Sequence, residues 1–415
     1  MAKVLVVGGG GREHAIVHAL SKSSKVDEIY AAPGNAGISK LAVCVNIKDT
    51  DAENIVAFAK TENIDLVVIG PEASLALGIV DRLQEEGIKV FGPKKDAAQI
   101  ESSKEFAKDL MQKYNIPTAR YKVFNDYKEA KAYIDLSPLP TVIKFDGLAA
   151  GKGVVVAFTK EEADNALKDM LLNVKFGEGK VVVEEYLDGP EFSFMCFVDK
   201  DKVYPLEMAQ DHKRAYDNDE GPNTGGMGAY SPLPFITKDD YEYALNKIMI
   251  PTAKALVREG HPFTGVLYGG LMKTKKGIKV IEFNARFGDP ETEVVLPRLT
   301  SDIFDAFNAV IDGKAPLLTW NNKFTIGIVL ASKGYPGSYA KGFKIENGMQ
   351  EHIYHMGTKF DDEGNLVTNG GRVLFAVQSG DTLEEANRLA NMLVDTIKCD
   401  NLYHRTDIGA KAYKK

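Results

Sequence analysis

The feature that most constrains the fold is a regular alternation of strand-like and helix-like segments along residues 1–100. Short runs rich in Val, Ile and Leu fit buried strands, and the segments between them carry apolar residues at helical spacing. The expected strands are residues 4–7, 28–32, 66–70 and 89–91, and the expected helices are 12–21, 52–62 and 76–86. This order predicts an α/β fold with a doubly wound parallel sheet, whose ligands bind at the carboxyl ends of the strands.

Length and composition indicate a globular chain of several domains. At 415 residues it is too long for one core, and 44% hydrophobic with 26% charged residues exclude a disordered or fibrous chain. The net charge of −7 argues against general nucleic-acid binding. Cys44, Cys196 and Cys399 lie far apart in no metal-binding spacing, which is typical of a reducing compartment. With no leader-like start and no membrane-spanning run, we expect a cytoplasmic protein without membrane or nucleic-acid partners.

The sequence predicts two further domains after the first. The expected divisions are a Rossmann-like N-terminal domain at 1–103, a two-lobed α+β domain at 104–324 with lobes at about 120–190 and about 191–324, and a small α/β domain at 325–415. Residues 211–231 form a long polar segment inside the two-lobed domain. Because loops of this length in compact domains are rarely simple connections, we expect a functional loop there.

The segment 281–286, Ile-Glu-Phe-Asn-Ala-Arg, is predicted to be a strand with two chemically different faces. Side chains alternate along a strand, so Glu282, Asn284 and Arg286 share one face and the apolar residues share the other. Two oxygen donors beside a guanidinium fit a divalent metal held against a phosphate. The Gly-Asp-Pro-Glu turn that follows adds two carboxylates. An exposed, solvated strand edge is the alternative.

Glycines follow the first expected strand, at residues 8–11, and lead directly into a helix. Such a loop lets backbone N–H groups approach an anion, and the helix N-terminus adds partial positive charge. The spacing argues against a dinucleotide site, because the sixth position of its fingerprint is Glu13 and no acid ends the second strand. A phosphate-sugar ligand fits better, and a tight turn without a ligand is the alternative. Loops at 33–37 and 70–74 would face the same ligand.

Residues 144–153 place Lys144 and Lys152 in a glycine-rich segment. It is not a phosphate loop of the Walker type, because three residues instead of four precede its Gly-Lys pair and a strand follows. It fits a glycine flap that covers a triphosphate, or else a surface hairpin. The next strand ends in Glu-Glu-Tyr-Leu at 184–187, which alone is unspecific.

Taken in order, the flap, the Glu-Glu-Tyr-Leu segment and the Glu-x-Asn-x-Arg strand resemble the ATP-grasp superfamily. More specific motifs are similar to those of the phosphoribosylamine–glycine ligases, or glycinamide ribonucleotide synthetases: Gly-Gly-Gly-Gly-Arg-Glu-His, Pro-Gly-Asn-Ala-Gly, Asp-His-Lys-Arg, Asn-Thr-Gly-Gly-Met-Gly and Arg-Phe-Gly-Asp-Pro-Glu. The resemblance covers essentially the whole chain. It implies a monomeric ligase of de novo purine biosynthesis. Such an enzyme joins glycine to 5-phosphoribosylamine with ATP and Mg²⁺ or Mn²⁺, through a glycyl phosphate.

The resemblance also implies roles for individual residues. The metal ligands would be Glu282 and Asn284. The residues that contact ATP would be Lys104, Lys144, Gly151, Lys152, Gly153, Glu184, Glu185, Tyr186, Leu187 and Glu191. The other substrates would contact Gly9, Gly10, Gly11, Asn35, Gly37, Pro71, Glu72 and Asp289, with Asp211, Lys213 and Arg286 as the catalytic residues. His14 and His212 also lie in these motifs, where packing is as consistent with a histidine as catalysis.

Two alternatives stay open. An ATP-grasp carboxylase or a formate-using ribonucleotide ligase would keep the mechanism and activate bicarbonate or formate in place of glycine. A nucleotide-binding regulatory module would bind without turnover, although intact Glu282, Lys144 and Lys152 argue against it.

Overall fold

The N-terminal segment forms the parallel sheet that its alternating pattern predicts. In the computed structural model, which describes residues 1–148 and 153–413, the strand order is β3-β2-β1-β4-β5 and all neighbours are parallel. The strands are β1 (Ala2–Gly8), β2 (Val26–Pro33), β3 (Val43–Cys44), β4 (Leu66–Ile69) and β5 (Val90–Phe91). Strands β1 and β4 are apolar on both faces because both faces are covered. The doubly wound prediction is confirmed.

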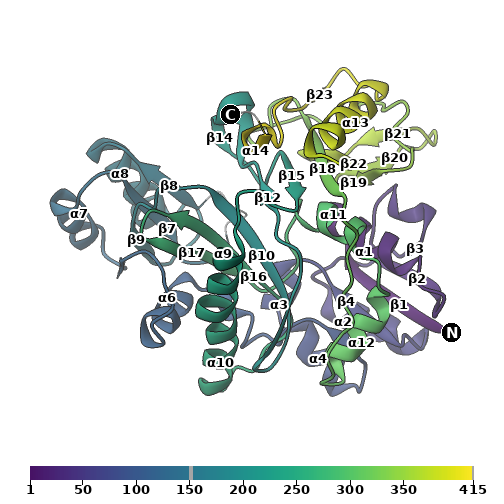
Figure 1. The fold of residues 1–415 in the computed structure, drawn as a ribbon, viewed down its shortest axis with the longest axis horizontal. Coiled ribbons are helices and arrows are strands. Elements are labelled where there is room, and N and C mark those ends of the chain that lie inside the picture. Colours follow the sequence, from purple (N-terminus) through teal and green to yellow (C-terminus); the bar gives the residue numbers. More distant parts are fainter. Residues whose placement is uncertain (149–152, 414–415) are drawn as a thin grey trace.

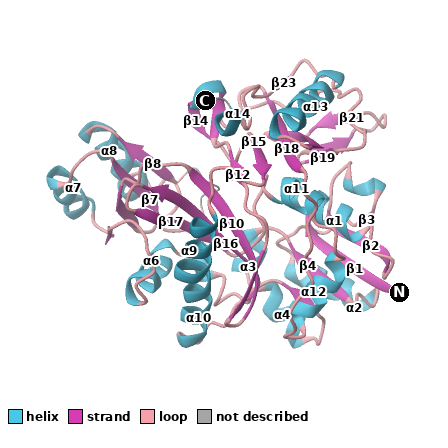
Figure 2. Ribbon diagram, in the orientation of Figure 1, coloured by secondary structure: helices cyan, strands magenta, loops and turns pink. Residues whose placement is uncertain are grey.

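Helices cover both faces of this sheet, as Figure 2 shows. The helices α1 (Gly11–Leu20) and α12 (Ile303–Ile311) pack with Val4 and Val6, whereas α2 (Ala52–Thr61) and α4 (Ile79–Glu85) pack with Leu5 and Val7. Alternate residues of one strand therefore contact different helix layers. The helix expected at 76–86 is two helices, α3 (Glu72–Ala76) and α4, because Gly78 adopts a left-handed φ of 80° between them.

The chain then forms a small antiparallel lobe at one end of the molecule (Figure 1). Its sheet has the order β6-β9-β7-β8 and joins the first domain through two short helices. The elements are α5 (Gln99–Ser102), α6 (Lys104–Lys113), β6 (Tyr121–Phe124), α7 (Tyr127–Leu136), β7 (Thr141–Phe145), β8 (Val154–Ala157), α8 (Lys160–Leu167) and β9 (Val181–Glu185). Helices α7 and α8 bury their apolar residues against this sheet in a core of its own.

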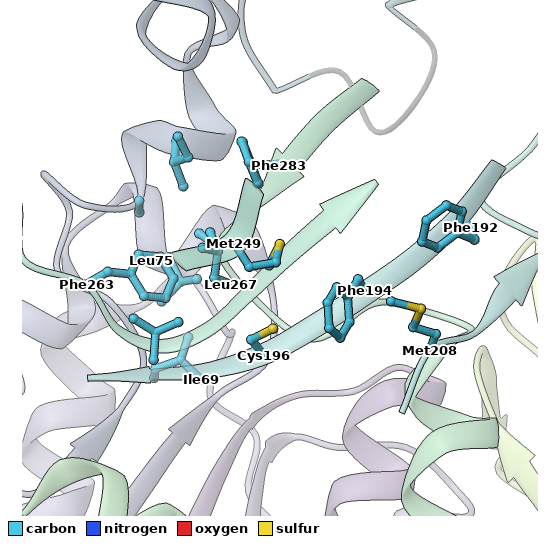
Figure 3. Packing of buried hydrophobic residues seen from close by; sticks show 14 of the residues in the cluster. Ile69, Leu75, Phe192, Phe194, Cys196, Met208, Met249, Phe263, Leu267 and Phe283 are labelled. Atoms are coloured by element: carbon cyan, nitrogen blue, oxygen red, sulfur yellow. The ribbon is translucent and has the colours of Figure 1, made fainter. Parts of the chain in front are cut away.

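The central sheet has the order β11-β10-β16-β17 and is antiparallel. Its elements are β10 (Glu191–Asp199), β11 (Lys202–Pro205), β16 (Thr264–Thr274) and β17 (Gly277–Asn284), followed by α11 (Thr292–Val295). The helices α9 (Lys238–Tyr243) and α10 (Ile250–Arg258) are joined by a π-helical stretch, Ala244–Met249. Figure 3 shows part of the core on this sheet, with Phe194, Met249, Leu267 and Phe283 buried together.

A third sheet joins two distant parts of the sequence. Its order is β12-β15-β18-β22-β19, and β23 also pairs with β18. The elements are β12 (Gln210–Asp211), β15 (Gly228–Ser231), β18 (Phe324–Ser332), β19 (Ile353–His355), β22 (Arg372–Gly380), α13 (Leu383–Thr396), β23 (Leu402–Tyr403) and α14 (Ala410–Tyr413). A two-stranded sheet, β20 (Thr358–Phe360) and β21 (Leu366–Thr368), lies beside it. Strands from the middle of the chain therefore complete the C-terminal sheet.

The polar segment expected to be a loop at 211–231 contains short strands. Between β12 and β15, β13 (Arg214–Tyr216) and β14 (Glu220–Asn223) pair with each other around a turn at Asp217–Asp219. Their residues show no apolar alternation because they form a ribbon with no buried face of its own. No helix in the described part of the chain combines the length and apolar character needed to cross a membrane.

Candidate active site

Glu282 lies on β17 with its carboxylate among several cations, while its neighbour Phe283 packs into the core on the other face. Burial raises the pKa of Glu282, but Lys213, Lys144 and Lys104 outweigh burial and hold that pKa below its ordinary value. These effects act through charge, and no hydrogen bond from the described residues contributes to them. The carboxylate is therefore ionised, and its lone pairs are available to a ligand.

Two buried lysines share one carboxylate beside this strand. Glu184 of β9 lies 3.0 Å from Lys144 Nζ through Oε1 and 2.9 Å from Lys108 Nζ through Oε2, and all three side chains are at most 5% exposed. Lys144 Nζ also donates to the carbonyl of Ile281 at 2.9 Å. Burial lowers the pKa of Lys108 to about 8, although Glu184 opposes the shift. The network fixes β7 and β9 of the small lobe against β17.

Lys104 stands at the first turn of α6 and contacts the start of the flap, which follows β7. Its Nζ donates to the carbonyl of Gly147 at 2.9 Å, and its backbone N–H donates to Asp146 Oδ1 at 2.6 Å. Burial lowers the pKa of Lys104, and nearby Lys144 adds to that effect while Glu282 opposes it. On the far side of the flap, the carbonyl of Gly153 accepts from Phe145 N–H at 2.8 Å. Gly151 and Lys152, which the sequence singled out, lie outside the described residues.

The segment expected to contact a nucleotide follows the end of β9. Glu185 pairs with Arg120 Nε at 3.2 Å, and the half-exposed Tyr186 ring lies 6.2 Å from the ring of Phe158. Leu187 is partly buried in the same bend. Glu191, at the start of β10, forms an ion pair with Lys213.

Arg286 joins β17 to the N-terminal domain. Its Nη2 lies 2.8 Å from Glu101 Oε1, and its Nε lies 3.4 Å from Glu72 Oε2, directly after Pro71. Nη2 also donates to Asn284 Oδ1 at 3.3 Å. Burial lowers the pKa of Arg286, but Glu101 and Glu72 outweigh it and raise that pKa overall. Burial likewise raises the pKa of Glu72, yet the two arginines Arg286 and Arg12 bring it to about 2.

The glycine loop between β1 and α1 is held closed by carboxylates of the protein. Gly10 N–H donates to Glu13 Oε2 at 2.7 Å, and Arg12 N–H donates to Asp289 Oδ2 at 3.3 Å. Gly9 has no room for a side chain, because an added Cβ would lie 2.5 Å from the carbonyl oxygen of Gly34. The loop thus has the close backbone approach expected of an anion site, but Glu13 and Asp289 occupy two of its N–H groups.

The side-chain carboxamide of Asn35 forms hydrogen bonds to three segments of the chain. Its Nδ2 donates to the carbonyl oxygens of Gly9 at 3.0 Å and His355 at 2.7 Å. Its Oδ1 accepts from the N–H groups of Gly37 and Ile38, both at 2.9 Å. The glycine loop, the loop after β2 and strand β19 of the C-terminal sheet are therefore fixed relative to one another.

Lys213 acts on both Glu282 and Asp211 through its charge. Burial raises the pKa of Asp211 to about 8, with Lys213 opposing and Glu291 adding to the shift. Burial lowers the pKa of Lys213, but Glu191 and Asp211 outweigh burial and raise that pKa well above its ordinary value. A carboxyl group that gains and loses its proton near neutral pH suits acid-base chemistry.

The two histidines of the motifs have structural roles in this conformation. His14 Nδ1 accepts from His355 N–H at 2.8 Å, and burial holds the pKa of His14 well below its ordinary value. His212 Nε2 accepts from Gly409 N–H at 3.1 Å, and burial lowers the pKa of His212 to about 3. Both rings are neutral acceptors of backbone hydrogen bonds.

Comparison with known proteins places the whole arrangement in one family. Three models of phosphoribosylglycinamide synthetase match: its N domain at residues 2–101, its ATP-grasp (A) domain at 102–292 and its C domain at 325–411. The chain belongs to the phosphoribosylglycinamide synthetase family.

Relatives in this family match along nearly their full length. The phosphoribosylamine–glycine ligase of Halalkalibacterium halodurans is 54% identical over 99% of this chain and 97% of the relative. A crystal structure of phosphoribosylamine–glycine ligase from Thermotoga maritima is 34% identical, with a TM-score of 0.87 over 98% of this chain and 100% of that one. A biotin carboxylase from Campylobacter jejuni, 15% identical with a TM-score of 0.75 over 97% of this chain and 93% of its own, shares the fold.

Three residues of this family member's site were missed by sequence reasoning. Arg372 of β22 pairs with Asp289 Oδ1 at 2.9 Å and donates to the carbonyls of Asp289 and Gly225. Glu293 is fully buried beside Asp289, and Glu101 pairs with Arg286. Each of these residues interacts with a residue from a distant segment of the chain, so no local sequence motif identifies it as part of the site. Glu291, whose role the sequence left open, accepts from the hydroxyls of Ser193 and Tyr268, both at 2.8 Å.

The donors on β17 fit a divalent metal that also binds phosphate. In the described ranges, no group of three or more His, Cys, Asp or Glu side chains is arranged to hold a metal. Glu282 and Asn284 offer one ionised carboxylate and one amide oxygen from the same strand face. Mg²⁺ in phosphate-binding sites is typically held by one or two carboxylates together with substrate phosphates. This donor set therefore fits such a cation once a triphosphate is present.

Proposed function

We propose that this protein is the ATP-dependent ligase that joins glycine to 5-phosphoribosylamine. The products are glycinamide ribonucleotide, ADP and phosphate, and the step belongs to de novo purine biosynthesis. Membership of the phosphoribosylglycinamide synthetase family supports this ligase reaction over its alternatives. The structural observation that carries the proposal is Arg286, which links the Glu282 strand to Glu72 in the N-terminal domain. A phosphate site on β17 and a sugar site at the glycine loops would then lie next to each other, with Arg286 at their common boundary.

The chemistry has two displacement steps. A carboxylate is a poor acyl donor because its leaving group would be oxide. The glycine carboxylate attacks the γ-phosphorus of ATP, the bond to the β-phosphate oxygen breaks, and glycyl phosphate and ADP form. The amine of phosphoribosylamine then attacks the acyl carbon, and inorganic phosphate leaves with one oxygen from glycine. No nucleophilic side chain is required.

The nucleotide lies between the small lobe and the central sheet in this proposal. Lys104 and Lys144, with Lys152 from the flap, neutralise its phosphates, and Glu282 and Asn284 would hold Mg²⁺ or Mn²⁺. The metal supplies charge stabilisation at the transferring phosphoryl group. The base and ribose contact the segment from Glu184 to Leu187 and Glu191. Because the carboxylate of Glu184 is paired with two lysines, its contribution to base binding comes from the backbone.

The acceptor amine lies at the glycine-loop side. Gly9 to Gly11, Asn35, Gly37 and Pro71 form its wall, and Glu72 and Asp289 accept from its hydroxyls. Arg286 orients the glycine carboxylate by charge. Asp211 accepts the proton that the amine loses on attack, since a carboxyl group with a pKa of about 8 exchanges its proton within reach of neutral pH and is a stronger base than an ordinary carboxylate. Lys213 stabilises the negative charge that remains near the reacting atoms.

We further propose that the chain works as a monomer in the cytoplasm. The reaction uses small-molecule substrates, and the site is built from one chain. Analytical ultracentrifugation at working concentration checks this, and a dimer whose partner completes the site would refute it.

Isotope transfer tests the function directly. With ¹⁸O-labelled glycine, 5-phosphoribosylamine and ATP, one ¹⁸O per turnover should appear in inorganic phosphate, and ADP release should require glycine. Matched reactions replace glycine by bicarbonate or formate. ADP release that depends on bicarbonate or formate, and not on glycine, would establish the carboxylase or formate-ligase alternative instead. Nucleotide binding without ADP release under every condition would identify a regulatory module.

A further inference from the structure

Arg405 is a charged side chain that the proposed chemistry does not use, and it is completely buried. It lies in the segment between β23 and α14, near the end of the described chain. Arginine is almost never fully buried unless its charge is paired. Moving the guanidinium out of water carries a large free-energy penalty, which a paired carboxylate offsets. Its burial therefore calls for a structural reason in its surroundings.

The guanidinium of Arg405 binds the ribbon formed by β13 and β14 through a hydrogen bond and an ion pair. Its Nη1 donates to the carbonyl of Arg214 at 3.0 Å, and its Nη2 lies 3.0 Å from Asp219 Oδ1. Asp407 receives Nε at 2.8 Å and Nη2 at 2.9 Å, which fixes the plane of the guanidinium. One side chain thus reaches both the start of β13 and the turn at the tip of the ribbon.

Neighbours of Arg405 extend the same contact. Thr406 donates to Asp217 twice, from its N–H at 2.8 Å and from its hydroxyl at 2.6 Å. Asn218 N–H donates to Asp407 Oδ2 at 2.9 Å. We call residues 405–409 the C-terminal clamp. Hydrogen bonds from this clamp hold the turn of the ribbon, although the two segments lie far apart in sequence.

The clamp also reaches the segment between β12 and β13, next to the proposed catalytic residues. Gly409 N–H donates to Nε2 of His212, the residue between Asp211 and Lys213. The backbone of the same segment is held by Thr224 N–H, which donates to the carbonyl of Lys213 at 2.7 Å. Arg214, whose carbonyl Arg405 binds, follows directly. Every residue from 212 to 214 thus has a contact that restrains its position.

We propose that Arg405 is a positioning residue for the reaction: through the C-terminal clamp it holds residues 212–214, and so sets where Asp211 and Lys213 lie relative to Glu282. This inference rests on the proposed function for the roles of Asp211 and Lys213. The clamp does not touch substrate. A segment from the C-terminal domain would thereby position charged groups of the site that lie in the middle of the chain.

The test compares Arg405→Met with Val394→Ala. Met keeps the length of the side chain and removes its charge, while Val394 is buried on α13 in the same C-terminal region and its side chain lies outside the ribbon contacts. In Arg405→Met we expect hydrogen exchange at residues 212–224 to accelerate at least tenfold, with exchange in β17 unchanged. kcat should fall about 10- to 100-fold with KM for ATP unchanged, because small misplacements of reacting groups cost this much. Val394→Ala should lower the melting temperature without either change.

A milder variant covers the case in which Arg405→Met fails to fold. Asp219→Asn removes the Arg405 and Lys411 ion pairs at the ribbon tip, and asparagine tolerates the positive φ of 56° found there. It should reproduce the faster exchange and a smaller loss of kcat. Unchanged exchange at 212–224 in Asp219→Asn overturns the proposal, as does an equal kcat loss in Val394→Ala. Hydrogen exchange needs no turnover, so a failed ligase assay with faster exchange would refute the function and leave the clamp.

Discussion

The two ends of the candidate site differ in whether the central polar side chain, Glu282 or Asn35, already has hydrogen-bond partners within the protein. At the metal-strand end, formed by β17 with Lys104 and Lys144, the Glu282 carboxylate is ionised and has no hydrogen-bond partner from the described chain. At the glycine-loop end, formed by residues 9–11 with Asn35 and Asp289, donors and acceptors already bond to each other.

This difference separates two ways of preparing a site. At the metal-strand end a ligand supplies the missing partner, so a lost side chain should reduce turnover more than stability. At the glycine-loop end a ligand must exchange with hydrogen bonds that hold the loops in place. A lost side chain there should reduce stability first. The following substitutions test that division, beginning with the largest expected effect.

Replacing Glu282 by Ala should reduce product formation about 10³-fold or more, because the metal and transferring phosphoryl group lose an ionised ligand. The far-UV circular dichroism spectrum should not change. Lys275→Ala, in the exposed turn between β16 and β17, is the control and should retain full turnover. Steady-state ADP release measures both. Unchanged turnover in Glu282→Ala would refute the metal assignment.

Replacing Asp211 by Asn should remove the rise of kcat with pH that the Asp211 carboxyl group causes in the unmodified protein. Since the pKa of Asp211 is about 8, its ionised fraction and the kcat of the unmodified protein should rise with pH through that value. The Asn variant should lose about 10²–10⁴-fold in kcat and show no such rise, while its Kd for ATP is unchanged. The measurement is kcat between pH 6 and 9.5. A rise that persists in Asp211→Asn would assign the proton transfer to another group.

The sequence predicted the metal-strand end better than the glycine-loop end for a physical reason. Alternation along a strand is local, so the face shared by Glu282 and Asn284 can be read from spacing alone. Arg286 was expected on the same strand, but β17 ends at Asn284 and Arg286 lies in the bend that follows. The partners of Arg286, and the bonds of Asn35 to His355, depend on how distant segments pack. The ribbon at 211–231 was likewise expected to be a loop, because short polar strands have no apolar period.

Replacing Asn35 by Ala should lower the free energy of unfolding by about 1–3 kcal/mol, because buried backbone groups lose their partners. Asn54→Ala is the matched control, since the exposed Asn54 side chain bonds only to Asp51 and its loss should change stability by about 0.5 kcal/mol or less. Urea denaturation measures both, and nucleotide affinity is measured alongside. If Asn35→Ala weakens nucleotide binding and leaves stability intact, the proposed division between the two ends is wrong.

Replacing Glu293 by Gln should have the smallest effect on turnover, within about threefold, because burial and Asp289 favour the protonated form that Gln resembles. Burial and Asp289 hold the pKa of Glu293 well above its ordinary value. In the unfolded chain Glu293 ionises at about 4.3. The folded protein keeps the proton, so its stability is highest below that pH and falls as pH rises toward the folded pKa.

The Gln variant should flatten this loss of stability, measured as melting temperature between pH 4 and 8. Glu293→Ala, which leaves a cavity, should be less stable than the unmodified protein at every pH. A pH dependence that is identical in Glu293→Gln would show that Glu293 ionises normally.

The sheet that unites β15 with β18 limits how this chain can be divided. A fragment beginning at residue 325 would contain β18, β22 and β19 but lack β12 and β15, the strands that cover one edge. The exposed N–H and C=O groups of β18 would then be available to other chains, which favours aggregation of the isolated fragment. Expression of the C-terminal part on its own should therefore include residues 210–231, supplied in the same polypeptide or as a second chain.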